Sequence, residues 1–412
     1  MKDVPLVISL EQGLSLPHGT QRMIRMGWRV IRIEMPHRDG VRRGDPNRFI
    51  GPEVGGEDRC AYFVPSNTGK QSLTIDLSTQ RGQDLLVELI QRLDVDVFCV
   101  NTLPANHTKL GIDAARLQAA HPTLIWASLS AWGIAHPNRP GYDPAMQGEL
   151  GFMSLTGEAE GIPLTSGVPM IDLLAGEQTF TAVCLALWQR DAALFRGETH
   201  VGVDPIDISM ARCAVSWLPT KLPLPTMGVS KERLARHANR HPMFGPVNSY
   251  AATDGWVFLA IGSDDQWRRL VSIPWMSSLE SQTRTTNEGR IVEQEAIDAE
   301  ITSLTRTRSH KDILSDWQSA GLVATPINGV EVTSGLEGIA EYLLHTTSPD
   351  GSQIPLTPSA FDAPLTTSSS RVIEKDEGLP FPPKLGEQTE EILLQAGFSN
   401  SEISHFKSEE II

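Results

Sequence analysis

The sequence predicts an α/β fold, with a large domain built on a mainly parallel sheet and a smaller α+β domain. Short apolar runs alternate with amphipathic helical stretches through the first half of the chain, as in repeated strand–helix–strand units. A proline-rich stretch, Pro219–Thr226, then interrupts this pattern and indicates a linker. Beyond it, two apolar runs flank the turn-forming pair Asp254-Gly255 and predict a β-hairpin.

The strands of the large domain are expected on five apolar runs: Leu6–Leu10, Arg29–Glu34, Gln71–Asp76, Val95–Asn101 and Thr123–Leu129. Helices are expected between or after them, including Thr20–Met26, Gln80–Leu93, Ile112–Ala120 and a long helix after Asp172, then a strand at Val203–Ile208 and a helix near Met210–Trp217. A Rossmann-like sheet of this kind binds ligands at the carboxyl ends of its strands.

The chain is expected to leave the large domain and return to it. The expected parts are, in order, the large domain at 1–205, a linker at 206–228, the small α+β domain at 229–325, a linker at 326–345, and a return to the large domain at 346–412. The small domain would contain the strand pair Val247–Ala251 and Trp256–Ile261. An amphipathic helix at Glu387–Ala396 would lie near the end of the chain.

The charge balance and the cysteines exclude several classes of protein. The 412 residues carry 35 basic and 50 acidic side chains, and a net charge of −15 argues against nucleic acid as a partner. No apolar run reaches the roughly 18 residues of a membrane span, and Leu6–Leu10 is too short for a signal peptide. The four cysteines contain no CxxC pair, which fits a reducing cytoplasm. We expect a cytoplasmic protein without membrane partners.

The sequence lacks three motifs that mark phosphate-binding or catalytic sites. Gly69-Lys70 resembles the end of a phosphate-binding loop, but Val64 stands where that motif needs glycine. No serine lies in a GxSxG turn, and no HExxH or histidine cluster predicts a catalytic metal. We therefore expect no metal site and no permanently bound cofactor.

A series of segments along nearly the whole chain carries a family pattern. They are, in order, Ser9–Pro17, Gly27–Glu34, Asn67–Leu77, Asp96–Gly111, Gly141–Gly157, Met170–Gly176, Arg236–Pro242, Asp254–Trp256 and Pro383–Glu387. Together they resemble the class III CoA-transferases, also called the CaiB–BaiF or formyl-CoA transferase family. Two departures stand out, since Thr102-Leu103 replaces the usual Phe-Arg and Ala105 replaces an expected glycine.

The resemblance implies an enzyme that moves CoA from an acyl-CoA to a free carboxylic acid, with Asp172 as the catalytic nucleophile. Attack on the thioester would give an aspartyl anhydride and then an aspartyl–CoA thioester. Asp172 precedes a helical pattern, and a helix N-terminus stabilises a carboxylate by about 0.3–1 kcal/mol, which would keep it ionised. A lone aspartate here would be an ordinary helix cap, but the surrounding segment favours the catalytic role.

Gln12 and Tyr142 are the residues that the resemblance places at the acyl site. The Gln12 amide would donate to a carboxylate or an oxyanion, or it is an ordinary polar residue at a strand end. Related racemases carry histidine where Tyr142 stands, and tyrosine is too weak an acid for that role at neutral pH. Tyr142 therefore favours transfer over racemisation, with a half-buried packing residue as the alternative.

Binding of CoA is expected to involve polar and basic side chains near the strand ends. The positions that resemble the family's CoA-binding surface are Lys70, Asn101, Thr102 and Lys109, with Arg32 and Arg38 as additional phosphate contacts. A few such cations bind phosphates even on an acidic chain. For each basic residue, a solvated surface charge is the alternative.

The resemblance also implies an interlocked homodimer, in which two subunits thread through each other; a heteromer with a related subunit is the alternative. Succinyl-CoA is the expected donor by family habit, and the sequence leaves the acceptor acid open. Two other functions stay open on the same fold: an acyl-CoA isomerase or racemase, including intramolecular CoA transfer, and a non-catalytic partner subunit. The intact Asp172 segment argues against the partner subunit.

Overall fold

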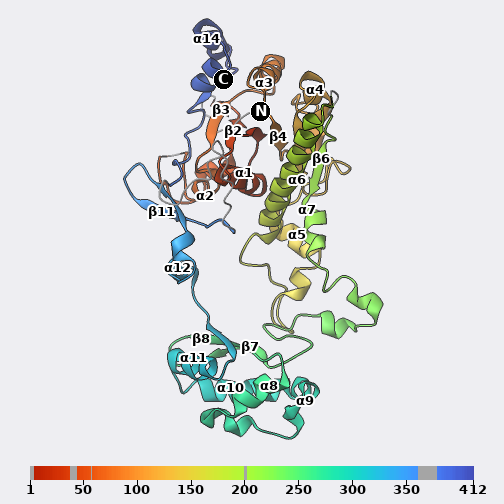
Figure 1. Cartoon of the computed structure of the whole chain (residues 1–412), viewed down its shortest axis with the longest axis vertical. Coiled ribbons are helices and arrows are strands. Elements are labelled where there is room, and N and C mark those ends of the chain that lie inside the picture. The colour runs from red at the N-terminus through yellow and green to blue at the C-terminus, as the bar shows by residue number, and fades with distance from the viewer. Residues whose placement is uncertain (1–3, 38–43, 57, 199–201, 361–377) are drawn as a thin grey trace. The chain divides into compact units, whose positions relative to one another are not determined.

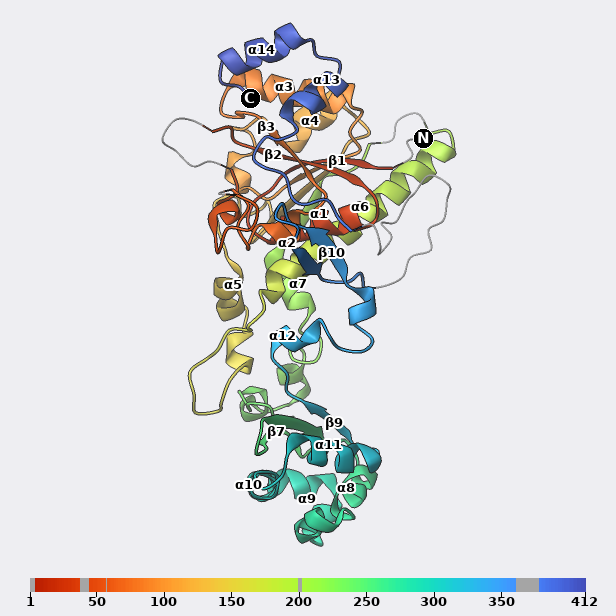
Figure 2. The ribbon, with the colours of Figure 1, turned by 90° about the vertical axis from the view of Figure 1, so that its left-hand side faces the viewer.

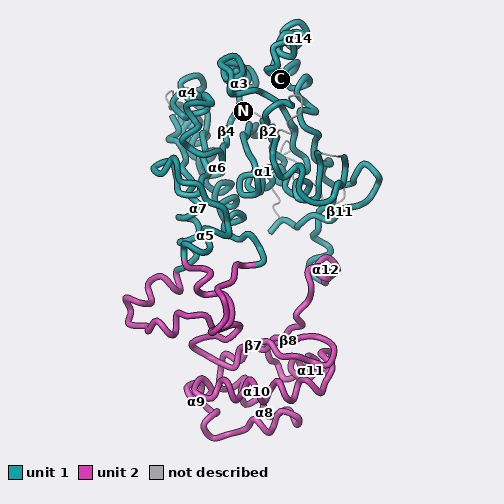
Figure 3. The backbone as a smooth tube through the Cα atoms, turned by 180° about the vertical axis from the view of Figure 1, so that it is seen from behind, with its two compact units in different colours: residues 1–150, 167–218, 337–412 teal, residues 151–166, 219–336 magenta. Residues whose placement is uncertain are grey.

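The computed structural model describes residues 4–37, 44–56, 58–198, 202–360 and 378–412. The chain divides into two compact units, shown in Figure 3: unit 1 comprises 1–150, 167–218 and 337–412, and unit 2 comprises 151–166 and 219–336. Residues 206–218, which we expected in a linker, carry a strand and a helix of unit 1.

Unit 1 is built on a six-stranded parallel sheet with the strand order β3-β2-β1-β4-β5-β6 (Figure 1). Its strands are β1 (Leu6–Leu10), β2 (Arg29–Glu34), β3 (Gln71–Thr74), β4 (Val97–Val100), β5 (Ile125–Ser130) and β6 (Ile206–Ser209). Nearly all of their residues are buried, because helices cover both faces of a parallel sheet. The strand order reverses between β1 and β4, and ligands of such sheets bind at the carboxyl ends beside that reversal. The predicted α/β class with a parallel sheet is confirmed.

Helices lie on both faces of the sheet, as Figure 2 shows. One face carries α3 (Gln80–Arg92), α4 (Ala114–Ala120), α13 (Thr389–Gln395) and α14 (Asn400–Ser408), and the other carries α1 (Ser15–Arg25), α6 (Met170–Phe195) and α7 (Met210–Ser216). Two short helices, α2 (Val64–Asn67) and α5 (Asp143–Glu149), and the antiparallel pair β10 (Leu344–Thr347) and β11 (Gln353–Leu356) complete the unit.

Unit 2 contains a three-stranded antiparallel sheet with the order β7-β8-β9. The strands are β7 (Val247–Ala251), β8 (Trp256–Ala260) and β9 (Val323–Pro326), and the helices are α8 (Asp264–Val271), α9 (Asn287–Val292), α10 (Gln294–Thr305), α11 (His310–Ser319) and α12 (Val330–Thr333). Its core packs Tyr250, Trp267 and Trp317 between sheet and helices. The hairpin that Asp254-Gly255 predicts is present as β7 and β8.

The end of the chain belongs to the core of unit 1. Ile392, Phe398 and Phe406 share one apolar cluster with β1–β4 and α3, and Asp76 N donates to Ile411 O at 2.7 Å. The expected last helix is α13, but α14 follows it and was not predicted. Its signal was present, since Ser399 and Glu402 form the reciprocal capping box that begins a helix.

Helix α6 is, among the described residues, the one helix long and apolar enough to cross a membrane by length and composition. A buried core helix meets the same criterion. Residues Leu174, Val183 and Leu187 of α6 are buried within unit 1, where the helix packs on α1 and β5. Packing therefore explains the buried apolar residues of α6, whereas Trp188 and Phe195 are exposed.

Helices α1 and α6 cross at two glycines. A Cβ atom on Gly19 would lie 2.7 Å from Gly176 O, and one on Gly176 would lie 2.5 Å from Ser15 O, both closer than Cβ atoms approach in proteins. The two backbones therefore meet only because both side chains are absent. The crossing brings Ser15, the first residue of α1, beside the first turn of α6. We expected α1 to begin at Thr20, but Pro17 is tolerated in its first turn.

A buried network of charges lies beneath the carboxyl ends of β1 and β2. It contains Glu11, Arg32, Glu34, Asp45, Arg48 and Lys70, all at most 4% exposed. Lys70 Nζ lies 2.6 Å from Glu11 Oε1, and Arg32 Nη2 lies 3.0 Å from Asp45 Oδ2. Burial alone would raise the pKa of Glu34, but Arg32 and Arg48 outweigh it and lower that pKa to about 2. The charges therefore stabilise one another in ionised form.

This network holds the loop that follows β1. Asp45 Oδ1 accepts from Gly13 N at 3.1 Å, and Asn47 Nδ2 donates to Gly13 O at 2.7 Å. Lys70 and Arg32, expected to contact phosphate, are enclosed and paired with carboxylates, Arg32 on β2 and Lys70 just before β3. We assign both to the support of this loop.

Replacing Gly176 by alanine should destabilise unit 1 by about 1–3 kcal/mol, although alanine is the better helix former. The added methyl group forces α1 and α6 apart at Ser15 O. Urea unfolding followed by circular dichroism measures the loss. Gly167→Ala is the control, since a Cβ there meets nothing within 4 Å; equal stability of the two variants would show that the crossing tolerates a side chain.

Replacing Lys70 by methionine should lower the free energy of unfolding by about 3 kcal/mol, because Glu11 is left buried without its closest cation. The double variant Lys70→Met/Glu11→Gln should recover part of that loss, since no uncompensated carboxylate remains. Lys407→Met removes an exposed ion pair and should cost less than about 0.5 kcal/mol. A double variant no more stable than Lys70→Met would contradict the pairing.

Candidate active site

A cleft of about 640 Å³ opens at the carboxyl ends of β1, β4 and β5, within unit 1. Its walls come from the loops after these strands, from the segment before α5, and from the first turn of α6. Among its lining residues are Gln12, Ser15, Asn101, Thr102, Arg139, Tyr142, Asp143 and Asp172. The structure thus gathers Asp172, Gln12, Tyr142, Asn101 and Thr102, five of the residues singled out in the sequence, in one cavity.

Asp172 lies in the first turn of α6, and its neighbour Asp143 occupies the start of that helix. Asp143 Oδ2 accepts from Ile171 N at 2.6 Å and from Asp172 N at 3.1 Å, and Asp143 Oδ1 accepts from Gln147 Nε2 at 2.5 Å. Asp143 is buried. Its carboxylate therefore satisfies the N–H groups that we expected to stabilise Asp172, and it fixes the backbone from which Asp172 projects.

The Asp172 carboxyl titrates above its usual range. Burial raises the pKa of Asp172 to about 6, the Ser15 hydroxyl opposes this shift by hydrogen bonding to the carboxylate, and the charge of Asp143 adds to it. This reverses the expected direction, because burial and a like charge outweigh the helix N-terminus. At neutral pH the group is mainly ionised but more basic than an exposed aspartate, as suits a nucleophile.

Gln12 and Asn101 connect the loops after β1 and β4. Gln12 N donates to Asn101 Oδ1 at 3.0 Å, and Asn101 Nδ2 donates to Gln12 O at 2.8 Å. This reciprocal pair involves the Gln12 backbone, and its side chain is exposed on the cleft without a hydrogen bond in the described part of the chain. The amide of Gln12 is therefore available to a bound ligand.

Tyr142 precedes α5 and is 82% exposed, so it is not the half-buried packing residue that we considered. Its ring lines the cleft next to Asp143. The adjacent Asp143 binds the first turn of α6, so the backbone of Tyr142 is held near that of Asp172.

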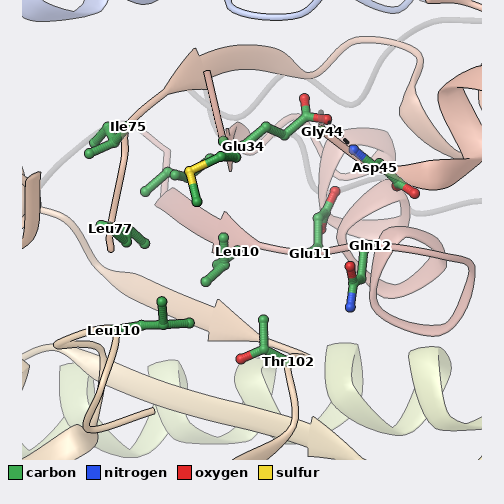
Figure 4. Close-up of a pocket in the computed structure, with 12 residues that line it drawn as sticks. Leu10, Glu11, Gln12, Glu34, Gly44, Asp45, Ile75, Leu77, Thr102 and Leu110 are labelled. Carbon is green, nitrogen blue, oxygen red and sulfur yellow. Dashed lines mark hydrogen bonds between the residues drawn. The ribbon is translucent and has the colours of Figure 1, made fainter. Parts of the chain in front are cut away.

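A second, smaller pocket of about 230 Å³ lies beside the same strand ends (Figure 4). One side of its lining is apolar, with Leu10, Ile33, Met35, Ile75, Leu77 and Leu110, and the other carries the carboxylates of the buried network, Glu11, Glu34 and Asp45. Gln12 and Thr102 line both cavities. Lys109 is exposed and adjoins Leu110 in the chain, whereas Arg38 lies outside the described residues. The smaller pocket therefore has apolar and acidic walls, and the larger cleft contains the carboxylate of Asp172.

Three further residues that line the cleft, Asp143, Ser15 and Arg139, were not singled out in the sequence. The sequence contains Asp143 in a recognised segment, Gly141–Gly157, but nothing there shows that its side chain reaches α6. Ser15 was read as part of a loop before the helix. Arg139 lies in a stretch without regular structure, and only the folded loop brings it to the cleft.

Comparison with known proteins agrees with this geometry. The profile described as CoA-transferase family III matches residues 5–389. A succinate–glutarate CoA-transferase of Agrobacterium fabrum is 31% identical over 337 residues, covering 79% of this chain and 79% of the relative. An acetyl-CoA:oxalate CoA-transferase of Acetobacter aceti is 28% identical over 335 residues, covering 80% and 82%. The crystal structure of a CaiB/BaiF family protein from Brucella suis matches with a TM-score of 0.80 and 26% identity, covering 95% of this chain and 98% of that one. The resemblance seen in the sequence is thereby confirmed, and the chain belongs to CoA-transferase family III.

Proposed function

We propose that this enzyme transfers CoA from a donor acyl-CoA to a free carboxylic acid through covalent intermediates on Asp172. The observation that carries the proposal is the Asp172 carboxylate in the cleft at the strand ends, with its backbone held by Asp143 and its pKa raised to about 6. Membership of the family makes acyl-CoA thioesters and carboxylates the substrate classes. The relatives named for succinate, glutarate and oxalate support succinyl-CoA as donor and a dicarboxylic acid as acceptor.

The reaction would begin with attack of an Asp172 oxygen on the thioester carbonyl carbon of the donor. The C–S bond breaks, CoA thiolate leaves, and a mixed anhydride remains. The thiolate then attacks the aspartyl carbonyl, which releases the donor acid and leaves an aspartyl–CoA thioester. The acceptor carboxylate attacks the aspartyl carbonyl carbon, which expels CoA thiolate and forms a second mixed anhydride. The thiolate then attacks the acceptor's carbonyl carbon, which gives the new acyl-CoA and regenerates the Asp172 carboxylate. Each step keeps the energy of an activated acyl bond.

The two cavities suggest how an extended thioester would lie. The apolar side chains of the smaller pocket would contact the nucleotide end of CoA, and Lys109, next to Leu110 in the chain, would contact a phosphate. The thioester end would reach the larger cleft past Gln12 and Thr102, which line both cavities. The free amide of Gln12 would donate to the oxyanion that forms at each attack.

Transfer is favoured over racemisation of an α-carbon. Racemisation needs a second acid–base group opposite Asp172, and a phenol such as Tyr142 is too weak an acid near neutral pH. The nucleophilic role of Asp172 needs no such partner.

Incubation with succinyl-CoA followed by hydroxylamine should convert Asp172 to its hydroxamate, detected by peptide mass spectrometry. Asp172→Ala should lose the adduct and reduce CoA transfer by about 10³-fold or more, since the nucleophile is removed. Asp113→Asn replaces an aspartate that caps α4 and should retain both. Absence of an adduct at Asp172 in a chain that binds CoA would contradict the covalent route.

The rate of acylation should rise with pH through about 6, because the reactive form of Asp172 is the carboxylate and burial raises its pKa to about 6. Below that midpoint the rate should fall by about tenfold per pH unit. Asp143→Asn keeps a hydrogen-bond acceptor at the start of α6 but removes the neighbouring charge, so the midpoint should move to lower pH. A profile of kcat/KM for acyl-CoA measures both midpoints, and a wild-type midpoint near 4 would contradict the raised pKa.

A further inference from the structure

Arg139 is the one cationic residue among those that line the Asp172 cleft in the described chain. The other charged lining residues are Asp143 and Asp172, and the protein as a whole has a net charge of −15. An anionic group that enters the cleft therefore meets two carboxylates and one cation. Arg139 is the side chain there that offers it a compensating charge.

The loop that carries Arg139 is anchored at several points. Pro137 O accepts from Ala105 N at 3.1 Å, which ties the loop to the segment after β4. Gly141 packs so closely against α5 and the residue after β5 that a Cβ there would lie 2.7 Å from Met146 Sδ and 2.8 Å from Ala131 Cβ. Asp143 then binds the backbone of Asp172. Four residues of chain span at most about 14 Å, so the backbone of Arg139 lies within that distance of Asp143, which caps the helix of Asp172.

Neighbouring side chains orient the guanidinium group of Arg139 but do not occupy all of its N–H donors. Its central carbon lies 3.4 Å from the centre of the Trp132 ring, a cation–π contact that fixes the plane of the group. Its Nη2 atom donates to Glu149 Oε1, and both side chains are nearly half exposed. Since arginine has five N–H donors, this ion pair leaves donors for a ligand.

We propose that Arg139 binds the distal carboxylate of a dicarboxylic acyl group whose proximal carbonyl carbon reacts with Asp172. The proposal rests on the proposed transfer reaction and names the residue that selects its dicarboxylic substrates. Donor and acceptor occupy the same acyl site in turn, so one arginine selects a dicarboxylate on both sides of the exchange. A monocarboxylic acid of equal length would leave Arg139 without that partner.

A phosphate of CoA is the other oxyanion that Arg139 could bind, and the substrates of the test separate the two. Glutarate and valerate are acceptors of equal chain length that differ in the distal carboxylate. Succinyl-CoA and butyryl-CoA are donors that differ in the same way but share all CoA phosphates. A contact to the distal carboxylate affects one member of each pair, whereas a contact to phosphate affects both donors.

The experiment compares kcat/KM for these four substrates in the wild type and in Arg139→Gln. Removal of a charge-assisted contact should lower the values for glutarate and succinyl-CoA by about 10- to 100-fold. Those for valerate and butyryl-CoA should stay within about twofold, and Arg139→Lys should fall between, since it keeps the charge but loses the planar fork. Arg81→Gln is the matched control, because Arg81 is also partly exposed, ion-paired and stacked on an aromatic ring, but outside the cleft.

Equal losses of kcat/KM for succinyl-CoA and butyryl-CoA in Arg139→Gln would assign Arg139 to a phosphate and overturn the proposal. A wild type that uses valerate as well as glutarate would also overturn it. A wild type that transfers CoA to neither acid would contradict the proposed function itself. Calorimetric titration with the two acids then decides the inference separately. If the wild type binds glutarate and Arg139→Gln weakens that binding at least about tenfold, the role of Arg139 is supported. If the wild type does not bind glutarate, or if Arg139→Gln binds it equally well, the role of Arg139 is contradicted.

Discussion

The carboxylate of Asp143 at the start of α6 is the interaction on which the site depends. It satisfies two backbone N–H groups of that helix, at 2.6 and 3.1 Å, and one of them belongs to Asp172. A buried helix end needs such a partner, and here the partner comes from a loop distant in the sequence. The same contact therefore positions the proposed nucleophile and joins the loop of Arg139 and Tyr142 to it.

This arrangement has an electrostatic consequence for Asp172. A charged cap close to a second carboxylate raises the pKa of Asp172, together with burial, while the Ser15 hydroxyl limits the rise to about 6. A lower pKa would make the group a weaker nucleophile, and a higher one would leave it protonated at neutral pH. The glycine crossing of α1 and α6 matters for this balance, because it is what brings Ser15 within reach.

The sequence predicts those parts of the protein that follow from local pattern. β1 and β2 begin and end at the predicted residues, because buried parallel strands are continuous apolar runs. The start of α1 was missed, since Gly13 and Pro17 suggest a loop unless the crossing with α6 is known. Asp172, Gln12 and Tyr142 came from a family pattern. The roles of Asp143, Ser15 and Arg139 depend on contacts between segments distant in the chain, which no local pattern contains.

The buried charges at the ends of β1 and β2 show that a basic residue in a family pattern can have a structural role and need not contact the ligand. Arg32 and Lys70 follow the family pattern, yet each is enclosed with carboxylates and supports the loop of Gln12 and Gly13. Enclosed charges must be paired, so they lose the freedom to meet a phosphate. Arg139 differs because it is half exposed, stacked and bonded through a single nitrogen. In an acidic protein, the cation able to select a substrate is the one whose pairing is incomplete.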